Sequence, residues 1–301
     1  IRDKLVTGVQ TCALPISKIN YRKVTMALTV RTNVAALRSI NQLNKTQSSL
    51  SGSLEKISSG LRVRRAADDS AGLAVASRMS SDNTSLRQAM RNANDGISLV
   101  QTAEGTLNEI GSLLTRMREL SVQSNNGTYT ASDRALIDQE FTALKGEIKR
   151  IASNSTFNGI SLLAGNTGFI TLQVGIDNGV SNKIGISLGA IGASLGALSI
   201  SALSVSTTAG AGAALTAIDT AINSISSKRS SLGATQNRLE SALSEAGTYS
   251  ENLSASQSQI MDLDYATESA TMTRYQIMQQ AGVAALGQAK AIPQSVISLL
   301  G

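Results

Sequence analysis

Apolar residues in the first part of the chain recur in alternating steps of four and three. This heptad spacing is typical of a helix that buries one narrow seam against a partner helix. Gln47 fills the one polar place in the run, and we expect the helix to reach back to about Thr29. The apolar positions are Leu43, Leu50, Leu54, Ile57 and Leu61.

A second run of the same spacing predicts a helix from the eighties to Ser124, broken once at Glu104. A third helix is expected from Ser132 to about Ala152, because Ser132 is a suitable N-cap after the turn SNNGTYTAS. The second run contains Leu86, Met90, Ala93, Ile97, Val100, Leu107, Ile110, Leu114, Met117 and Leu120.

The strongest periodicity lies in the C-terminal half, where every seventh residue from Ile218 to Ile260 is apolar. The second heptad position of the same helix is about half polar and includes Arg229. This pattern predicts a long helix with one edge of its seam exposed to water. The same three-four spacing continues from Tyr275 to Leu299. We therefore expect two further long helices, which end the chain.

The segment between Gly165 and Ala214 is rich in Gly, Ser, Thr and Ala. Apolar residues alternate over 170–176 and again over 184–188, on either side of the turn residues Asp177, Asn178 and Gly179. This pattern predicts a β-hairpin, with a looser third strand at 198–206.

The predicted fold is mainly α. Long terminal helices form a coiled coil, and the remainder is a rod-like helical bundle with a small β-hairpin region. A helix of about 40 residues spans roughly 60 Å and cannot bury its seam inside a small domain. Self-assembly is therefore the first functional inference.

Composition argues against an enzyme. The chain has no histidine, so the commonest general base and metal ligand are missing. Its one cysteine, Cys12, allows neither an internal disulfide nor a thiolate metal cluster. We expect no catalytic residues, no cofactor and no metal.

Charge and hydropathy give no sign of a nucleic-acid or membrane partner. The net charge is +6, but residues 1–25 hold five basic side chains against one acidic, and the rest is nearly balanced. No apolar run of 18 residues occurs, so we expect no membrane insertion. Residues 1–26 differ in composition from the rest of the chain, and we interpret them as a leader that is not native.

A charged stretch, SGLRVRRAADDSAGLAV, comes after the first helix. Neighbouring aspartates on a helix point about 100° apart, so Asp68 and Asp69 do not form a catalytic pair. We interpret the stretch as a structural link, in which Gly60 ends one helix and a new one begins after Asp68 or Asp69. Arg62, Arg64 and Arg65 then make local ion pairs and caps.

Two further motifs are weak. AGAGAAL has Leu215 where a dinucleotide-binding loop needs its third glycine. Asp262 and Asp264 lack the additional clustered ligand that a metal site requires, and we expect them to cap the start of the last helix.

Several motifs, in order, resemble one family: bacterial flagellin. They are ISSGLRVRRAADDSAGLAVASRM, LTRMRELSVQSNNGTYTASDRALIDQEF, FNGISLLAG, RSSLGATQNRLESAL, ENLSASQSQIMDLDYATE and QIMQQAGVAALGQAKAIPQSVISLL. The resemblance covers residues 26–301 apart from roughly 177–212.

The resemblance implies a division of the chain. Residues 27–72 would hold the N-terminal core helix and a connecting spoke, and 261–301 the C-terminal spoke and core helix. The inner rod would occupy 73–260, with a β-rich insert at about 165–212. Outer variable domains are nearly absent, which makes this a minimal member. The link residues Arg62, Arg64, Arg65, Asp68, Asp69, Asp262 and Asp264 are then assembly candidates.

The resemblance also implies a function. The chain would be the structural subunit of the flagellar filament for motility, exported unfolded and added at the filament tip. Its partners would be itself, an export chaperone, and the cap and hook-filament junction proteins. Toll-like receptor 5, a vertebrate innate receptor, would recognise Arg116 and Leu120, taken as one face of a helix, together with Glu140.

The nearest alternative is a hook-filament junction protein, which shares the terminal helices but is present in few copies. An enzyme-bearing flagellin would need a metal motif such as HExxH, which the absence of histidine excludes. A basic nucleic-acid binder would show steep salt dependence after removal of the leader.

Overall fold

The computed structural model describes residues 32–164 and 168–300, with side chains described up to 291. The interpretation of residues 1–26 and the expected helix start at Thr29 lie outside the described residues. The chain is mainly α, as predicted, and it divides into two compact units. One is built around the two terminal helices, and the other comprises residues 60–264.

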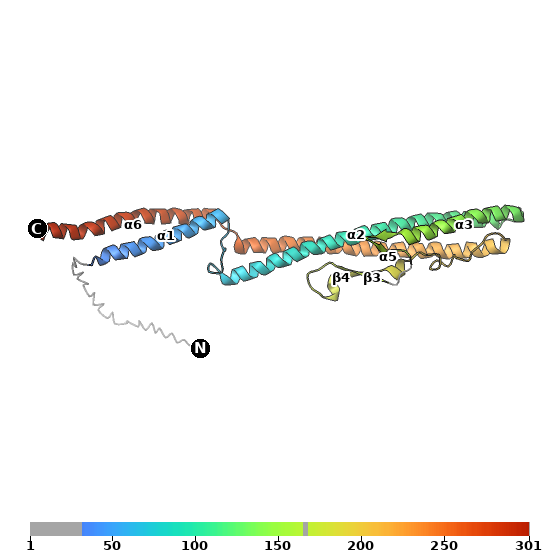
Figure 1. Cartoon of the computed structure of the whole chain (residues 1–301), viewed down its shortest axis with the longest axis horizontal. Helices are drawn as coiled ribbons and strands as arrows, with labels where there is room; N and C mark the ends of the chain where they lie inside the picture. The colour runs from blue at the N-terminus through green and yellow to red at the C-terminus, as the bar shows by residue number, and fades with distance from the viewer. Residues whose placement is uncertain (1–31, 165–167, 301) are drawn as a thin grey trace, which may run out of the picture. The chain divides into compact units, whose positions relative to one another are not determined.

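In the first unit, α1 (Val34–Ser59) and α6 (Tyr265–Leu300) lie side by side (Figure 1). They run antiparallel, because Asn33 donates to the carbonyl of Ala289 at 2.7 Å while Gln47 accepts from Gln279 further along. Gln47 is the polar break in the first heptad run, and its partner on α6, Gln279, is also polar.

The second unit is organised by α2 (Ser70–Ser124) and α5 (Thr208–Met261), which pair antiparallel along their length (Figure 1). A third helix, α3 (Ala131–Asn154), packs against the C-terminal part of α2. The core between them is apolar and closely packed. Its fully buried side chains include Leu107, Ile110, Leu114, Met117, Phe141, Ile148 and Ile218.

The helix starts confirm one prediction and correct two others. α2 begins at Ser70 with Asp69 as its N-cap, so the predicted start after Asp68 or Asp69 is confirmed. The start in the eighties that the apolar run indicated is wrong, because the first turns bury the small Ala76, which a search for large apolar residues misses. α3 begins at Ala131, and its N-cap is Thr130 rather than Ser132. Thr130 and Asp133 form a reciprocal capping box, and these hydrogen bonds lower the pKa of Asp133.

The predicted hairpin is confirmed. β3 (Phe169–Gln173) and β4 (Lys183–Ser187) are antiparallel, with Thr171 opposite Gly185, and the 3-10 turn η1 (Val180–Asn182) precedes β4. A shorter hairpin, β1 (Thr156–Phe157) and β2 (Ile160–Ser161), was not predicted.

The third strand expected at 198–206 is wrong. After α4 (Leu188–Ile191) this segment runs as turns, because side chains of α3 take up its backbone groups. Lys145 donates to the carbonyl of Leu203 at 2.6 Å, and Asp138 accepts from the amide of Val205 at 2.6 Å. The alternating apolar residues therefore bury without a strand partner.

The larger hairpin lies against α2 at a residue without a side chain. A Cβ at Gly96 would overlap the side chain of Leu172 and approach that of Leu239 to 3.3 Å. Gly96 thus lets β3 come close to the α2–α5 pair. This contact fixes where the hairpin lies along the rod.

The polar breaks in the two long seams meet each other. Glu104 interrupts the run on α2, Arg229 interrupts the row on α5, and their side chains form an ion pair at 3.3 Å. A shift of one heptad in one direction would place Glu104 against Ile222 and Arg229 against Ile97, and a shift in the other direction would also separate the two charges. We infer that the pair fixes the alignment of the two helices.

We expect Glu104→Arg or Arg229→Glu alone to lower the free energy of unfolding by about 1 kcal/mol, because each places like charges together in a partly exposed seam. The double variant should recover most of the loss. Urea unfolding followed by circular dichroism measures both. A loss in the double variant equal to the sum of the two single losses would contradict the pairing.

Candidate self-assembly site

The α1–α6 pair leaves much of its apolar surface uncovered. Leu50 and Ala289 are buried within the pair, but Leu37 on α1 and Ile277 on α6 are 52% and 61% exposed. Large apolar side chains left exposed in this way mark an interaction site. The exposed large apolar residues of the pair are Val34, Leu37, Ile40, Leu54, Tyr265, Ile277, Met278 and Val283.

The link that comes after α1 begins with a backbone reversal. Gly60 has a φ of 71°, the left-handed conformation that commonly ends a helix, so the prediction that it terminates the first helix is confirmed. The chain crosses this link twice, once after α1 and once after α5. The two crossings are joined by an antiparallel β-bridge between Leu61 and Asp262. The Arg62 amide also donates to the Met261 carbonyl at 2.7 Å.

Arg62 caps the C-terminus of α5. Its Nε and Nη2 donate to the carbonyl of Ile260 at 3.2 and 2.7 Å, and Nη2 also reaches the carbonyl of Gln259. Carbonyls at a helix C-terminus lack partners within the helix and carry partial negative charge, so a guanidinium there satisfies and stabilises them.

Asp68 and Asp69 perform different structural tasks. Asp68 Oδ2 accepts from the backbone amides of Arg64 and Arg65, each at 3.1 Å, and so closes the turn. Asp69 is the N-cap of α2 and accepts from the amide of Gly72 at 2.9 Å. A Cβ at Gly72 would overlap the Asp69 carboxylate, which explains the glycine.

Asp262 and Asp264 lie on the returning link. Asp262 is the C-cap of α5 and accepts from the Ser258 hydroxyl, so its carboxylate acts at the end of α5 rather than at the start of α6. Asp264 immediately precedes α6. The structure thus brings Arg62 and Asp262 to the end of α5, and Arg64, Arg65 and Asp68 into one turn beside it.

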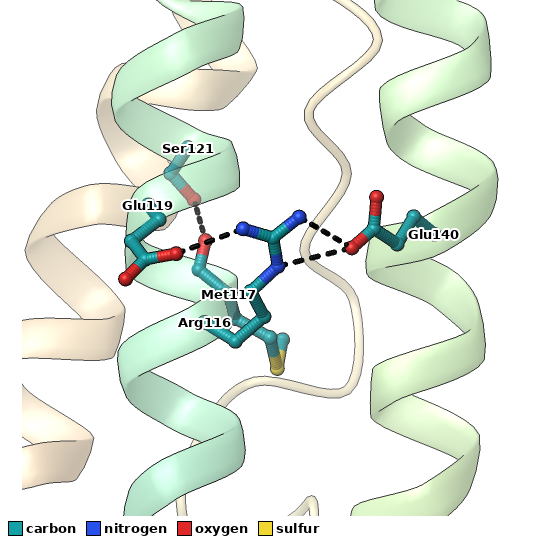
Figure 2. Close-up of polar contacts among 5 residues, drawn as sticks. All are labelled: Arg116, Met117, Glu119, Ser121 and Glu140. Atoms are coloured by element: carbon teal, nitrogen blue, oxygen red, sulfur yellow. Dashed lines mark hydrogen bonds and ion pairs between the residues drawn. The ribbon is translucent and has the colours of Figure 1, made fainter.

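A second charged group lies on α2 and α3 (Figure 2). Arg116 donates to Glu140 of α3 through Nε at 3.0 Å and Nη2 at 2.9 Å, and to Glu119 of its own helix at 2.9 Å. These carboxylates raise the pKa of Arg116, Glu119 most through its hydrogen bond. All three side chains remain about half exposed. The i, i+3 spacing of Glu119 was visible in the sequence, but its role was not predicted.

Leu120 does not share this surface. It is 2% exposed and lies in the core of the α2–α5 pair, so the expectation that Arg116 and Leu120 form one accessible face is wrong. A spacing of four residues on a helix turns the chain about 40° past a full turn. That rotation moves Leu120 from the margin into the seam.

The described residues hold no group of three or more His, Cys, Asp or Glu side chains placed to bind a metal ion. AGAGAAL lies within α5, so Gly210 and Gly212 line no phosphate loop. Across the described part of the chain, no helix has the length and apolar character needed to cross a membrane.

Comparison with known proteins matches both ends of the chain to one family. The model of the bacterial flagellin N-terminal helical region matches residues 30–167, and that of the C-terminal helical region matches 215–300. A flagellin of Halalkalibacterium halodurans is 40% identical over 82% of this chain and 90% of its own length.

A second relative and one solved structure are also similar to this chain. The flagellar filament 33 kDa core protein of Treponema phagedenis is 39% identical over 89% of this chain and 98% of its own length. The solved structure of a putative flagellar hook-associated protein from Vibrio parahaemolyticus shares the fold, with a TM-score of 0.53 and 16% identity over 65% of this chain and 100% of that one.

The two family models together cover most of the chain and span the exposed helices, the links and the Arg116 group. The chain therefore belongs to the bacterial flagellin family, whose members are structural subunits of the flagellar filament.

Proposed function

We propose that this chain polymerises with copies of itself into an extracellular filament that serves as a propeller for motility. The observation that supports this proposal is the apolar surface that α1 and α6 leave uncovered in a single chain. Two antiparallel helices bury only one seam each, so further copies are needed to cover the rest. Repetition of that contact produces a helical polymer.

The links would set the geometry of each subunit in the polymer. Arg62 holds the end of α5, and Asp68 and Asp69 hold the turn and the start of α2. The Arg62 bonds connect the two passages of the chain, whereas those of Asp68 and Asp69 are local to the turn and to the first turn of α2. We infer that they act in assembly rather than in chemistry.

Export and delivery complete the proposal. We infer that the chain leaves the cell unfolded and is added at the filament tip, with an export chaperone, a cap protein and junction proteins as partners. The single cysteine supports this route, because the chain forms no internal disulfide that would obstruct threading.

The first test is polymerisation of the purified chain, followed by light scattering and electron microscopy. We expect long filaments from the unmodified protein. Asp68→Ala with Asp69→Ala should abolish or shorten them, because the turn and the α2 cap are lost, while costing the residue 60–264 unit only about 1 kcal/mol through the cap.

The matched control is Asp95→Ala with Glu109→Ala, which removes the same charge from exposed positions on α2. It should polymerise normally. If the unmodified chain forms no filaments alone, the alternative of a hook-filament junction protein, present in few copies, is favoured. If both double variants polymerise equally well, the links have no role in assembly.

We also propose that Toll-like receptor 5 recognises the surface around Arg116 and Glu140. The support is that a half-exposed guanidinium is held between two carboxylates in a fixed orientation, which suits a directional polar contact. Leu120 would support recognition indirectly, because its buried side chain packs α2 against the core and does not contact the receptor. Its truncation would cost about 2–5 kcal/mol, so it is a poor probe of recognition.

Arg116→Ala should reduce receptor activation in a reporter-cell assay about tenfold or more, because an interface guanidinium is often a dominant contact. Arg118→Ala is the matched control, since Arg118 forms its ion pair with Asp219 of α5 instead. Equal activation by both variants would refute recognition through Arg116.

A further inference from the structure

We propose that Asn178 is a self-modifying residue, whose side-chain amide is converted to a carboxylate by its own backbone with Lys183 as the catalytic donor. Asn178 and Gly179 lie in the exposed connection between β3 and β4. Lys183 begins β4, and its Nζ donates to Oδ1 of Asn178 at 2.8 Å. This inference is independent of the proposed filament function.

The reaction needs only water as a co-reactant. The backbone nitrogen of Gly179 attacks the side-chain carbonyl carbon of Asn178 and gives its proton to water, while the carbonyl electron pair moves onto Oδ1. The intermediate then collapses, the side-chain carbon–nitrogen bond breaks, and the nitrogen leaves as ammonia with a proton from water. Water finally opens the cyclic imide to aspartate or isoaspartate.

Lys183 acts where charge develops. In the ground state Oδ1 carries a partial charge, and in the tetrahedral intermediate it carries a full one. An ammonium already 2.8 Å from Oδ1 therefore stabilises the intermediate more than the starting amide. Gly179 adds no side chain that would crowd the attacking nitrogen.

The connection holds the two groups together. Nε2 of Gln173 donates to the carbonyls of Gly175 and Asp177 at 2.8 and 2.7 Å. The amides of Val174 and Gly175 both donate to the carbonyl of Asn182. These bonds tie the two ends of the connection to each other, so Lys183 stays near Asn178 without help from a partner molecule.

The chain supplies two internal comparators with the same dipeptide. Asn126, before Gly127, accepts a weaker neutral bond from the amide of Thr128 at 3.2 Å. Asn158, before Gly159, lies in a left-handed turn with a φ of 48°. Arg134 donates to the backbone carbonyl of Asn126 at 3.0 Å, but the hydrogen bonds of the described residues show no cationic donor to the side-chain oxygen of Asn126 or Asn158.

Conversion would alter a defined surface. The connection lines a groove of ≈ 710 Å³ against α5, whose wall includes Asp177, Arg238 and Glu245. A new carboxylate at residue 178 would add negative charge next to Asp177, which lines this groove, and would pair with Lys183. An isoaspartyl product would also lengthen the backbone within the connection.

The test is mass spectrometry of the full chain aged at mildly alkaline pH, with a non-tryptic digest to follow all three Asn-Gly pairs. Relative to its rate in denaturant, Asn178 should convert faster than Asn126 and Asn158. Lys183→Met should slow Asn178 about three- to tenfold, less than a buried oxyanion donor would because the site is exposed. Lys183→Arg should retain part of the rate.

Two controls make the outcome decisive. In denaturant, Lys183→Met and the unmodified chain should convert Asn178 at equal rates, since the contact is then lost. Gly179→Ala fits the structure, because its Cβ meets nothing closer than 3.5 Å, and it should nearly stop conversion by crowding the nucleophile. The proposal would be overturned if folded Lys183→Met converted Asn178 as fast as the unmodified chain, or faster. It would also be overturned if Gly179→Ala converted Asn178 at an undiminished rate.

Discussion

The pairing of α2 with α5 is the contact on which the residue 60–264 unit depends. The helices are 55 and 54 residues long, so a single seam orients almost every other element of the unit. α3 packs on α2, and the larger hairpin reaches the pair at Gly96. An error in their alignment would displace all of these, and we infer that the partly exposed Glu104–Arg229 pair helps to prevent it.

The seam is not uniform along its length. Its large apolar core lies between Ala93 and Leu120 on α2, whereas nearer the links the contact with α5 combines a small apolar cluster of Leu86, Ala246 and Leu253 with polar side chains. There the Asn83 side chain bonds Ser254 at 2.9 Å and accepts from Ser250. A polar pairing gives less free energy than apolar burial but specifies geometry more tightly. Hydrogen bonds therefore help to align the part of the unit nearest the links.

Periodicity predicted the long helices, the larger hairpin and the helix end at Gly60, because each is encoded by local spacing or by a single glycine. It failed at 198–206, where Asp138 and Lys145 from a distant helix take the backbone bonds that a strand partner would take. It placed Leu120 correctly in the apolar run of α2, whereas the resemblance assigned the same residue to a receptor surface from which it is buried. The larger hairpin lies outside both family models, so its geometry came from the structure alone.

We propose that the apolar surface of α1 and α6 is completed only by other copies of the chain. Among the side chains described up to residue 291, few apolar ones are buried between the two helices, so this pair should open readily in a single chain. Hydrogen exchange of monomer and polymer tests this most directly. We predict fast exchange of α1 and α6 amides in the monomer, strong protection in the polymer, and protection of the α2–α5 core in both. Terminal helices as protected in the monomer as α2 and α5 would contradict the account.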